Sequence, residues 1–259
     1  MIFGDLLRRS ARGLRRILLP SFDLMLLERA RFLRLARPGG TLLDAGCGDG
    51  TLSFLLARRG WRVVGVSSDA DAIARLRERG AALGLPPDRI EFRFHDLARD
   101  GPPSPPGKTG FDAALCFDVL EHIADDRAAL AAVAASLREG GRLLLTVPDR
   151  TAPPLWGDAV LAAEAGGHVR AGYTRDELLA LLREAGLGPA RWAGFAGFFT
   201  QKATSVSRRL ERRSGVASLA LRFLWLLAMR PLCRIDPLFP WPDYEIFVMA
   251  ERESVIRDS

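Results

Sequence analysis

Residues 42–51 read Leu-Leu-Asp-Ala-Gly-Cys-Gly-Asp-Gly-Thr. The apolar run over 41–45 predicts a buried strand, the three alternating glycines predict a tight turn, and the leucine-rich segment that begins at Thr51 predicts a helix. A strand, a glycine turn and a helix in this order allow main-chain atoms to approach an extended ligand. The start of the helix adds free N–H groups and a partial positive charge. The stretch therefore predicts a ligand site where the first strand ends.

The rest of the chain repeats this alternation of strands and helices. Further strands are expected at 62–67, 90–94, 111–117, 142–147, 191–199 and 244–250. Helices are expected at 23–36, 69–79, 125–138 and 174–186, with Gly80 ending the second of them. Strands that alternate with helices at this spacing predict a parallel α/β sheet covered on both faces, with its ligand beyond the carboxyl ends of the strands.

The seven residues Asp-Ala-Gly-Cys-Gly-Asp-Gly at 44–50 resemble the first motif of the class I S-adenosylmethionine-dependent methyltransferases. The resemblance implies a Rossmann-like, doubly wound sheet of seven mostly parallel strands. It also implies that Gly46, Cys47 and Gly48 lie against the methionine part of S-adenosylmethionine, and that Asp44 helps to hold its amino group. A dinucleotide site would have glycine at the position of Thr51, which disfavours a nicotinamide enzyme.

The next two strand ends supply residues for the nucleoside part of the cofactor. The dinucleotide-binding fold and the methyltransferase fold both usually place an acid after the second strand, where it binds the ribose hydroxyls. This sequence has Ser67 and Ser68 there, followed by Asp69. Whether Ser67 or Asp69 takes the role of that acid is left open by the sequence. Asp96 resembles the acid that binds the adenine amino group, with the N–H of Leu97 beside it; the alternative is an Asp that caps the loop.

Residues 111–123 resemble the fourth motif of the same superfamily, notably of its small-molecule branch. In that family the carbonyl near Phe117 meets the methionine amino group, and Asp118 and His122 face the cavity where the methyl group is transferred. His122 is interpreted either as a base or as a packing residue.

The segment 166–174, Gly-Gly-His-Val-Arg-Ala-Gly-Tyr-Thr, resembles a loop that follows the fifth strand in many small-molecule methyltransferases. His168, Arg170 and Tyr173 are candidates for the acceptor site, and the alternative is a latch that joins the loop to the next helix. A hydroxyl acceptor benefits from a base that titrates near neutral pH, so His122 and His168 are the candidate catalytic residues. An amine acceptor would need only alignment.

Amino-acid composition narrows the classes of protein to which this chain can belong. Three cysteines without a Cys-x-x-Cys pair argue against a disulfide framework or a zinc site, so no metal is predicted and a reducing cytoplasm is expected. No secretory signal is recognised, and no apolar run reaches the roughly 20 residues that span a bilayer. Segment 38–190 has 17 basic and 21 acidic residues, whereas 1–37 has nine arginines against three acids and 200–235 has eight basic residues against one acid.

These two basic flanks define the domain organisation that we expect. Residues 1–37 form an N-terminal helical extension, 38–199 with 244–253 form the cofactor-binding domain, and 200–243 form a basic, leucine-rich helical insertion before the last strand. Residues 5–19 place leucines on one helical face and arginines mostly on the other. Leucines rather than aromatic residues accompany the arginines in both flanks. This composition favours binding to an anionic membrane surface, at the inner face of the membrane, and makes nucleic acid an improbable partner. The alternatives are a lid, a pocket cap or a dimer helix.

The sequence thus predicts S-adenosylmethionine-dependent methyl transfer to a small-molecule or lipid-linked acceptor, with oxygen as the expected acceptor atom. Two other classes stay open at this stage. One is a nucleotide-dependent oxidoreductase, and the other is a non-catalytic membrane-associated protein that kept the fold. The sequence names neither the acceptor nor the oligomeric state.

Overall fold

A computed structural model describes residues 24–36, 39–152, 167–211 and 215–253. The chain divides into two compact units. The sheet unit comprises Phe32–Thr151, Ala165–Gly194 and Glu245–Ser259, and the helical unit comprises Met1–Arg31, Ala152–Glu164 and Phe195–Tyr244. The amphipathic segment predicted at 5–19 lies outside the described residues.

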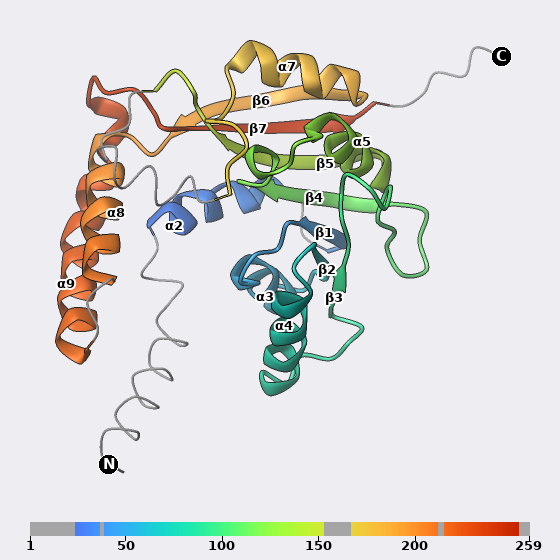
Figure 1. The fold of residues 1–259 in the computed structure, drawn as a ribbon, viewed down its shortest axis with the longest axis horizontal. Coiled ribbons are helices and arrows are strands. Elements are labelled where there is room, and N and C mark those ends of the chain that lie inside the picture. Colours follow the sequence, from blue (N-terminus) through green and yellow to red (C-terminus); the bar gives the residue numbers. More distant parts are fainter. Residues whose placement is uncertain (1–23, 37–38, 153–166, 212–214, 254–259) are drawn as a thin grey trace. The chain divides into compact units, whose positions relative to one another are not determined.

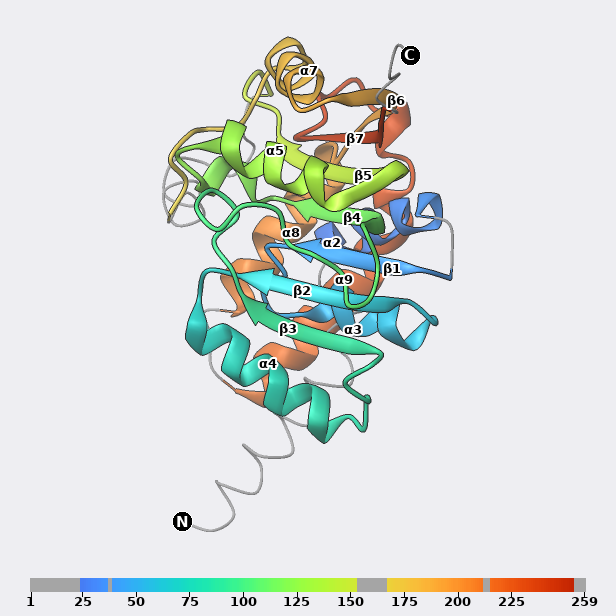
Figure 2. The same ribbon diagram turned by 90° about the vertical axis from the view of Figure 1, so that its right-hand side faces the viewer.

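The sheet unit is built on seven strands in the order β3-β2-β1-β4-β5-β7-β6, as Figures 1 and 2 show. The strands are β1 (Thr41–Ala45), β2 (Arg62–Ser67), β3 (Ile90–Phe94), β4 (Phe111–Phe117), β5 (Leu137–Pro148), β6 (Leu187–Phe195) and β7 (Glu245–Arg252). β1 pairs in parallel with β2 and β4, whereas β7 runs antiparallel to β5 with Leu144 opposite Met249. The predicted doubly wound, mostly parallel seven-stranded sheet is confirmed.

Helices connect these strands and bury apolar faces against them. They are α3 (Thr51–Arg58), α4 (Ala70–Ala82), α5 (Asp126–Ser136) and α7 (Arg175–Glu184), with short 3-10 helices η2 (Phe32–Leu35) and η3 (Leu120–His122). The core packs central strand residues such as Leu43 and Leu143 against α5 and α7, for example at Leu130 and Leu178, and all four side chains are fully buried. Thr174 caps α7 and forms a capping box with Glu177.

Several predicted boundaries were wrong. α4 does not stop at Gly80 but continues to Ala82, because Gly80 keeps a helical backbone and the left-handed turn comes only at Gly84, with φ of +67°. The predicted strand at 191–199 lies four residues earlier, at 187–195. The segment expected as one helix over 23–36 is divided into α2 (Leu24–Ala30) and η2.

The helical unit contains α2, α8 (Phe198–Glu211), α9 (Val216–Cys233) and the 3-10 helix η4 (Asp236–Leu238). Leu24 of α2, Ala203 of α8 and Leu226 of α9 share one small apolar core. Asp236 is buried and its two carboxylate oxygens accept the N–H groups of Phe199 (2.7 Å) and Thr200 (3.0 Å), which satisfies free donors at the start of α8. None of the described helices is both long and apolar enough to cross a bilayer.

Candidate active site

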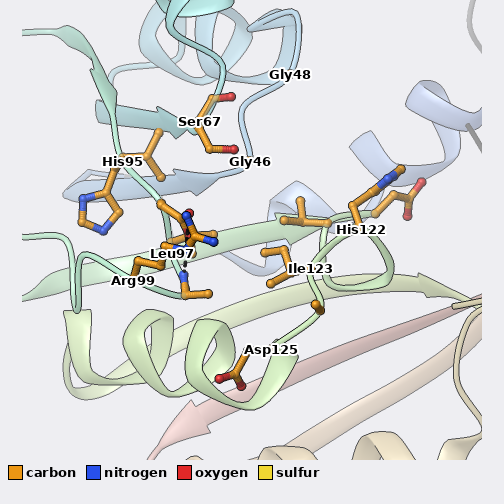
Figure 3. Close-up of a pocket in the computed structure, with 16 residues that line it drawn as sticks. Gly46, Gly48, Ser67, His95, Leu97, Arg99, His122, Ile123 and Asp125 are labelled. Carbon is orange, nitrogen blue, oxygen red and sulfur yellow. Dashed lines mark hydrogen bonds and ion pairs between the residues drawn. The ribbon is translucent and has the colours of Figure 1, made fainter. Parts of the chain in front are cut away.

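A cavity of about 550 Å³ opens in the sheet unit where β1, β2, β3 and β4 end (Figure 3). Eight of the residues singled out from the sequence line it: Gly46, Gly48, Ser67, Ser68, Asp96, Leu97, Asp118 and His122. The other seven lie outside that lining: Asp44, Cys47, Asp69, Phe117, His168, Arg170 and Tyr173. The strand ends therefore bring together residues that are up to 76 positions apart in the chain, as a parallel sheet requires.

The glycine turn is the wall that follows β1. Gly46, Gly48 and Gly50 all have left-handed backbones, with φ of +75°, +51° and +72°. The N–H groups of Gly46 and Cys47 both donate to the carbonyl oxygen of Val66, at 3.0 and 2.9 Å. A Cβ atom at Gly46 would collide with Val119, whereas one at Gly48 would meet nothing within 4 Å. The turn therefore offers bare main chain and open space on the side of Gly48.

Asp44 lies beneath this turn and not on the cavity wall. Its side chain is buried and accepts a hydrogen bond from the hydroxyl of Ser53. Burial raises the pKa of Asp44 to about 6; the Ser53 hydrogen bond opposes the shift and nearby Asp49 adds to it. Asp44 thus holds the first turn of α3 against the end of β1.

The strand end at β2 separates two of the candidates for ribose binding. Ser67 and Ser68 line the cavity. Asp69 is instead the N-cap of α4, and its carboxylate accepts the N–H of Ala72 at 2.9 Å. The Ser67 hydroxyl accepts the N–H of Asp69 at 3.2 Å, so the two residues form one tight turn. The geometry therefore favours Ser67 over Asp69 for contact with a ligand.

The loop after β3 presents Asp96 and Leu97 to the cavity. One carboxylate oxygen of Asp96 accepts the N–H of Ala98 at 3.0 Å, and the other lies 3.7 Å from Nε of Arg99. His95 also lines the cavity, and its Nε2 is 2.9 Å from the carbonyl oxygen of Gly101. The Asp96 carboxylate thus caps its loop and also lines the cavity, and its contact with the adenine amino group stays a prediction.

Asp118 forms the wall that follows β4. It is one of two described non-glycine residues with positive φ, at +52°. Thr146 of β5 holds it there, because the Thr146 hydroxyl donates to the Asp118 carboxylate at 2.7 Å and the Asp118 N–H donates to the Thr146 carbonyl at 3.0 Å. A left-handed non-glycine residue fixed by its neighbours is characteristic of binding sites.

Two histidines and a glutamate meet at the far side of the cavity from the β3 loop. His122 lines the cavity, and the His168 ring packs edge to face against it with centroids 4.4 Å apart. Glu121 is 1% exposed, and the potential ligand atoms of Glu121, His122 and His168 lie within 4.8 Å of one another. Burial, and then the charge of His122, lowers the pKa of His168. The N–H of Val169 donates to the Glu121 carbonyl at 2.9 Å and ties the two segments together.

Sequence reasoning named His122 and His168 as separate candidates and missed that they meet each other and Glu121 in one cluster. Glu121 was available as the neighbour of His122, but 46 positions separate His122 from His168. Such a spacing gives no local signature for a shared site. The three side chains are close enough to share a cation, so the absence of a metal stays a prediction.

Arg170 and Tyr173 belong to a network around Asp126 at the start of α5. The Tyr173 hydroxyl lies 2.8 Å from the Asp126 carboxylate, and Arg170 donates to that hydroxyl at 2.6 Å, to the same carboxylate and to the Ala124 carbonyl at 2.9 Å. Tyr173 is 3% exposed. These contacts form a latch between the loop and α5, which precedes it in the chain, whereas the latch alternative joined the loop to the helix that follows it. A direct contact of Arg170 or Tyr173 with an acceptor stays a prediction.

Proteins of known type share this sequence and this architecture. The chain is 34% identical over 162 residues to a ubiquinone biosynthesis O-methyltransferase of Xanthomonas euvesicatoria. The matched stretch covers 60% of this chain and 65% of that protein. The corresponding enzyme of Xylella fastidiosa strain M23 is 35% identical over 162 residues, 60% of the chain and 63% of its own length. The chain thus spans somewhat less than two thirds of the length of these relatives.

Solved structures show the fold independently. Phosphoethanolamine N-methyltransferase 2 of Haemonchus contortus superposes with a TM-score of 0.63 at 15% identity, over 88% of this chain and 52% of that one. Geranyl diphosphate C-methyltransferase of Streptomyces coelicolor superposes with a TM-score of 0.60 at 17% identity, over 87% and 78%.

A family model described as a methyltransferase domain matches residues 21–189, well over half of the sequence. That span contains the glycine turn, the four cavity walls and the histidine pair. The chain is therefore a member of the methyltransferase domain family, whose cofactor is S-adenosylmethionine.

Proposed function

We propose that this protein transfers a methyl group from S-adenosylmethionine to an oxygen atom of a small-molecule acceptor, of which a lipid-linked molecule is one form. Oxygen is supported as the acceptor atom because the relatives described above are O-methyltransferases. The observation in this chain that carries the proposal is the pair His122 and His168 beside the cavity.

The residues present fit the cofactor. The open space beside Gly48 would be filled by any larger side chain, and a bare turn of this kind accommodates the methionine part. Ser67 and Asp96 both line the cavity, where Ser67 would bind a ribose hydroxyl and the Asp96 carboxylate would accept a hydrogen bond from the adenine amino group. When bound, the cofactor supplies an electrophilic methyl group on a sulfonium, so that the protein needs mainly to align the acceptor and exclude water.

The histidine pair would remove the proton of the acceptor hydroxyl. The side chain of His122 lines the cavity, so a ring nitrogen of His122 takes that proton as the oxygen forms its new bond. His168 has a lowered pKa and stays neutral near pH 7, so it does not add a second positive charge beside the protonated His122. Glu121, a carboxylate within 4.8 Å, stabilises the imidazolium that forms.

The test measures transfer of a labelled methyl group to a panel of phenols, catechols, alcohols and amines, each with and without a long alkyl chain. We expect label in hydroxyl acceptors. The His122→Ala variant should lose about 10²-fold or more in turnover, the usual contribution of a general base, while its affinity for S-adenosylhomocysteine stays within about twofold. His95→Ala is the matched control, because His95 lines the same cavity from the β3 loop and should keep its turnover at saturating cofactor.

Label found only in amines, or wild-type turnover in His122→Ala, would contradict the proposal. Inhibition by EDTA that zinc reverses would assign the cluster to a metal ion and contradict the role of His122 as a base. Calorimetry with a nicotinamide dinucleotide in place of S-adenosylhomocysteine tests the oxidoreductase alternative, which the family match disfavours. We expect no binding of the dinucleotide.

A further inference from the structure

Helix α9 has an exposed row of leucines opposite its buried face. Leu226, Met229 and Cys233 point into the core of the helical unit. Leu221, Leu224 and Leu227 lie on the other side and are 53%, 60% and 55% exposed. Residues three apart fall on neighbouring positions of a helix, so these leucines form one continuous stripe.

The stripe continues beyond the end of α9. Ile235 is 42% exposed, and Leu238 of η4 is 83% exposed, the highest value among the exposed large apolar side chains of the described residues. Phe239 follows and contacts Phe198 and Phe199, with ring centroids 5.2 Å apart in both pairs. We call Leu221, Leu224, Leu227, Ile235 and Leu238 the leucine face.

The exposed charged side chains of α9 and of the residue that follows it are all arginines. The sequence contains no Asp or Glu from 212 to 235. Arg230 and Arg234 are exposed beside the leucine face. Arg222 points inward, and its Nε donates to the Ser207 hydroxyl at 2.7 Å. The nearest acid that follows, Asp236, is buried on the start of α8.

We propose that the leucine face docks on the surface of an anionic lipid bilayer. Leucines with arginines at their margin are the composition of helices that lie in the interface of a membrane, where apolar side chains enter the acyl boundary and arginines extend to the headgroups. A second copy packed on the same face across a two-fold axis would bring the arginines of both copies close together, which costs free energy. Anionic headgroups neutralise them instead. The inference does not rest on the proposed methyl transfer.

Vesicle cosedimentation of the full chain tests this docking. The wild type should partition onto vesicles of phosphatidylcholine with about 30 mol% phosphatidylglycerol, and more weakly onto phosphatidylcholine alone. The triple variant L221S/L224S/L227S should lose roughly tenfold or more of this partitioning, because it removes most of the buried apolar area. Leu83→Ser is the matched control: Leu83 is an exposed leucine of the sheet unit, and its loss should leave partitioning unchanged.

The double variant R230Q/R234Q separates charge from apolar contact and also serves if the triple variant does not fold. It should lose partitioning on the anionic vesicles and keep the weak partitioning on neutral ones. Circular dichroism and calorimetry with S-adenosylhomocysteine check that each variant is folded. Equal partitioning of wild type and folded variants would overturn the proposal. So would light scattering that shows a wild-type dimer and a monomeric triple variant, since that result assigns the face to a second copy.

Discussion

Gly48 is a residue of the cavity wall at which a single substitution should weaken cofactor binding. We expect Gly48→Val to reduce the affinity for S-adenosylhomocysteine by roughly tenfold to hundredfold, because its side chain enters the open space on the cavity wall. The left-handed φ of +51° adds about 1–2 kcal/mol of strain to the folded state. Calorimetry measures the affinity, and thermal unfolding confirms that the variant folds.

Gly84→Val is the control for that strain. Gly84 has φ of +67°, a Cβ there also meets nothing within 4 Å, and it follows α4 outside the cavity lining. We expect a similar loss of stability and no loss of affinity. Equal affinities of the two variants would show that the space beside Gly48 does not hold the ligand.

Asp96 caps its loop and is predicted to contact the adenine, and a matched residue can separate the two roles. Asp96→Ala should weaken S-adenosylhomocysteine binding at least several-fold, since a hydrogen bond to a charged acceptor contributes about 1.5–3 kcal/mol. Asp149 makes the same type of turn, accepting the N–H of Thr151 at 2.8 Å, but it is outside the cavity lining. Asp149→Ala should therefore leave the affinity unchanged. Unchanged affinity in Asp96→Ala would refute the adenine contact.

The raised pKa of Asp44 predicts a dependence of stability on pH. The folded value of about 6 exceeds the ordinary 3.8, so the folded protein retains this proton where the unfolded chain has lost it. Asp44 therefore lowers the free energy of unfolding as the pH rises from about 4 to about 6, and the penalty remains at higher pH.

Asp44→Asn removes that penalty and keeps an oxygen for the Ser53 hydroxyl. Its stability relative to wild type should rise by on the order of 1–3 kcal/mol between about pH 4 and pH 7. Urea unfolding at several pH values measures the difference. A difference that does not change with pH would contradict a buried carboxyl that keeps its proton.

At the scale of the elements, the latch between the loop at 166–174 and α5 distinguishes a structural from an acceptor role for Tyr173. Burial raises the pKa of Tyr173 to about 12, with nearby Arg170 lowering it, so its hydroxyl stays protonated and bonded to Asp126. Tyr173→Phe should lower Tm by a few degrees, the effect of about 1–2 kcal/mol, at unchanged turnover. A fall in turnover with Tm unchanged would assign Tyr173 to the acceptor.

Elements with a strong local signal were predictable from the sequence. β1, β2, β3 and β4 have the predicted residues, because β1, β2 and β4 are short, mostly apolar runs and β3 alternates apolar and charged residues. α4 was predicted too short, since Gly80 reads as a stop but keeps a helical backbone. β5 begins five residues early, because Leu137 already pairs with Phe111 and the turn expected at Gly140 is a bulge inside the strand, with φ of +67°.

The site was predictable where it follows strand ends and not where it depends on tertiary packing. Ser67 ends β2, and Asp96, Asp118 and His122 follow β3 or β4 within five residues, so parallel topology alone brings them to one edge. The contact of His168 with His122 depends on how a loop folds back after β5, and no local pattern encodes that return.

At the scale of the whole molecule, charge is divided between the acidic segment 38–190 and the basic flanks. Residues 1–20 alone contain five arginines and one acid. Removing them should reduce partitioning onto anionic vesicles and should make the remaining binding less sensitive to salt, since fewer phosphates are neutralised. Cosedimentation over a salt series measures both effects. Equal partitioning of the two forms would exclude a contribution of this segment.

The double hydrogen bond to the Val66 carbonyl has a kinetic consequence. Because β2 already holds the N–H groups of Gly46 and Cys47, the loop is ordered before a ligand arrives, and its conformational entropy is lost in folding instead of in association. The cofactor then meets a preorganised surface, and loop closure does not limit its on-rate. Differences in affinity among variants of this wall should therefore appear as changes in residence time.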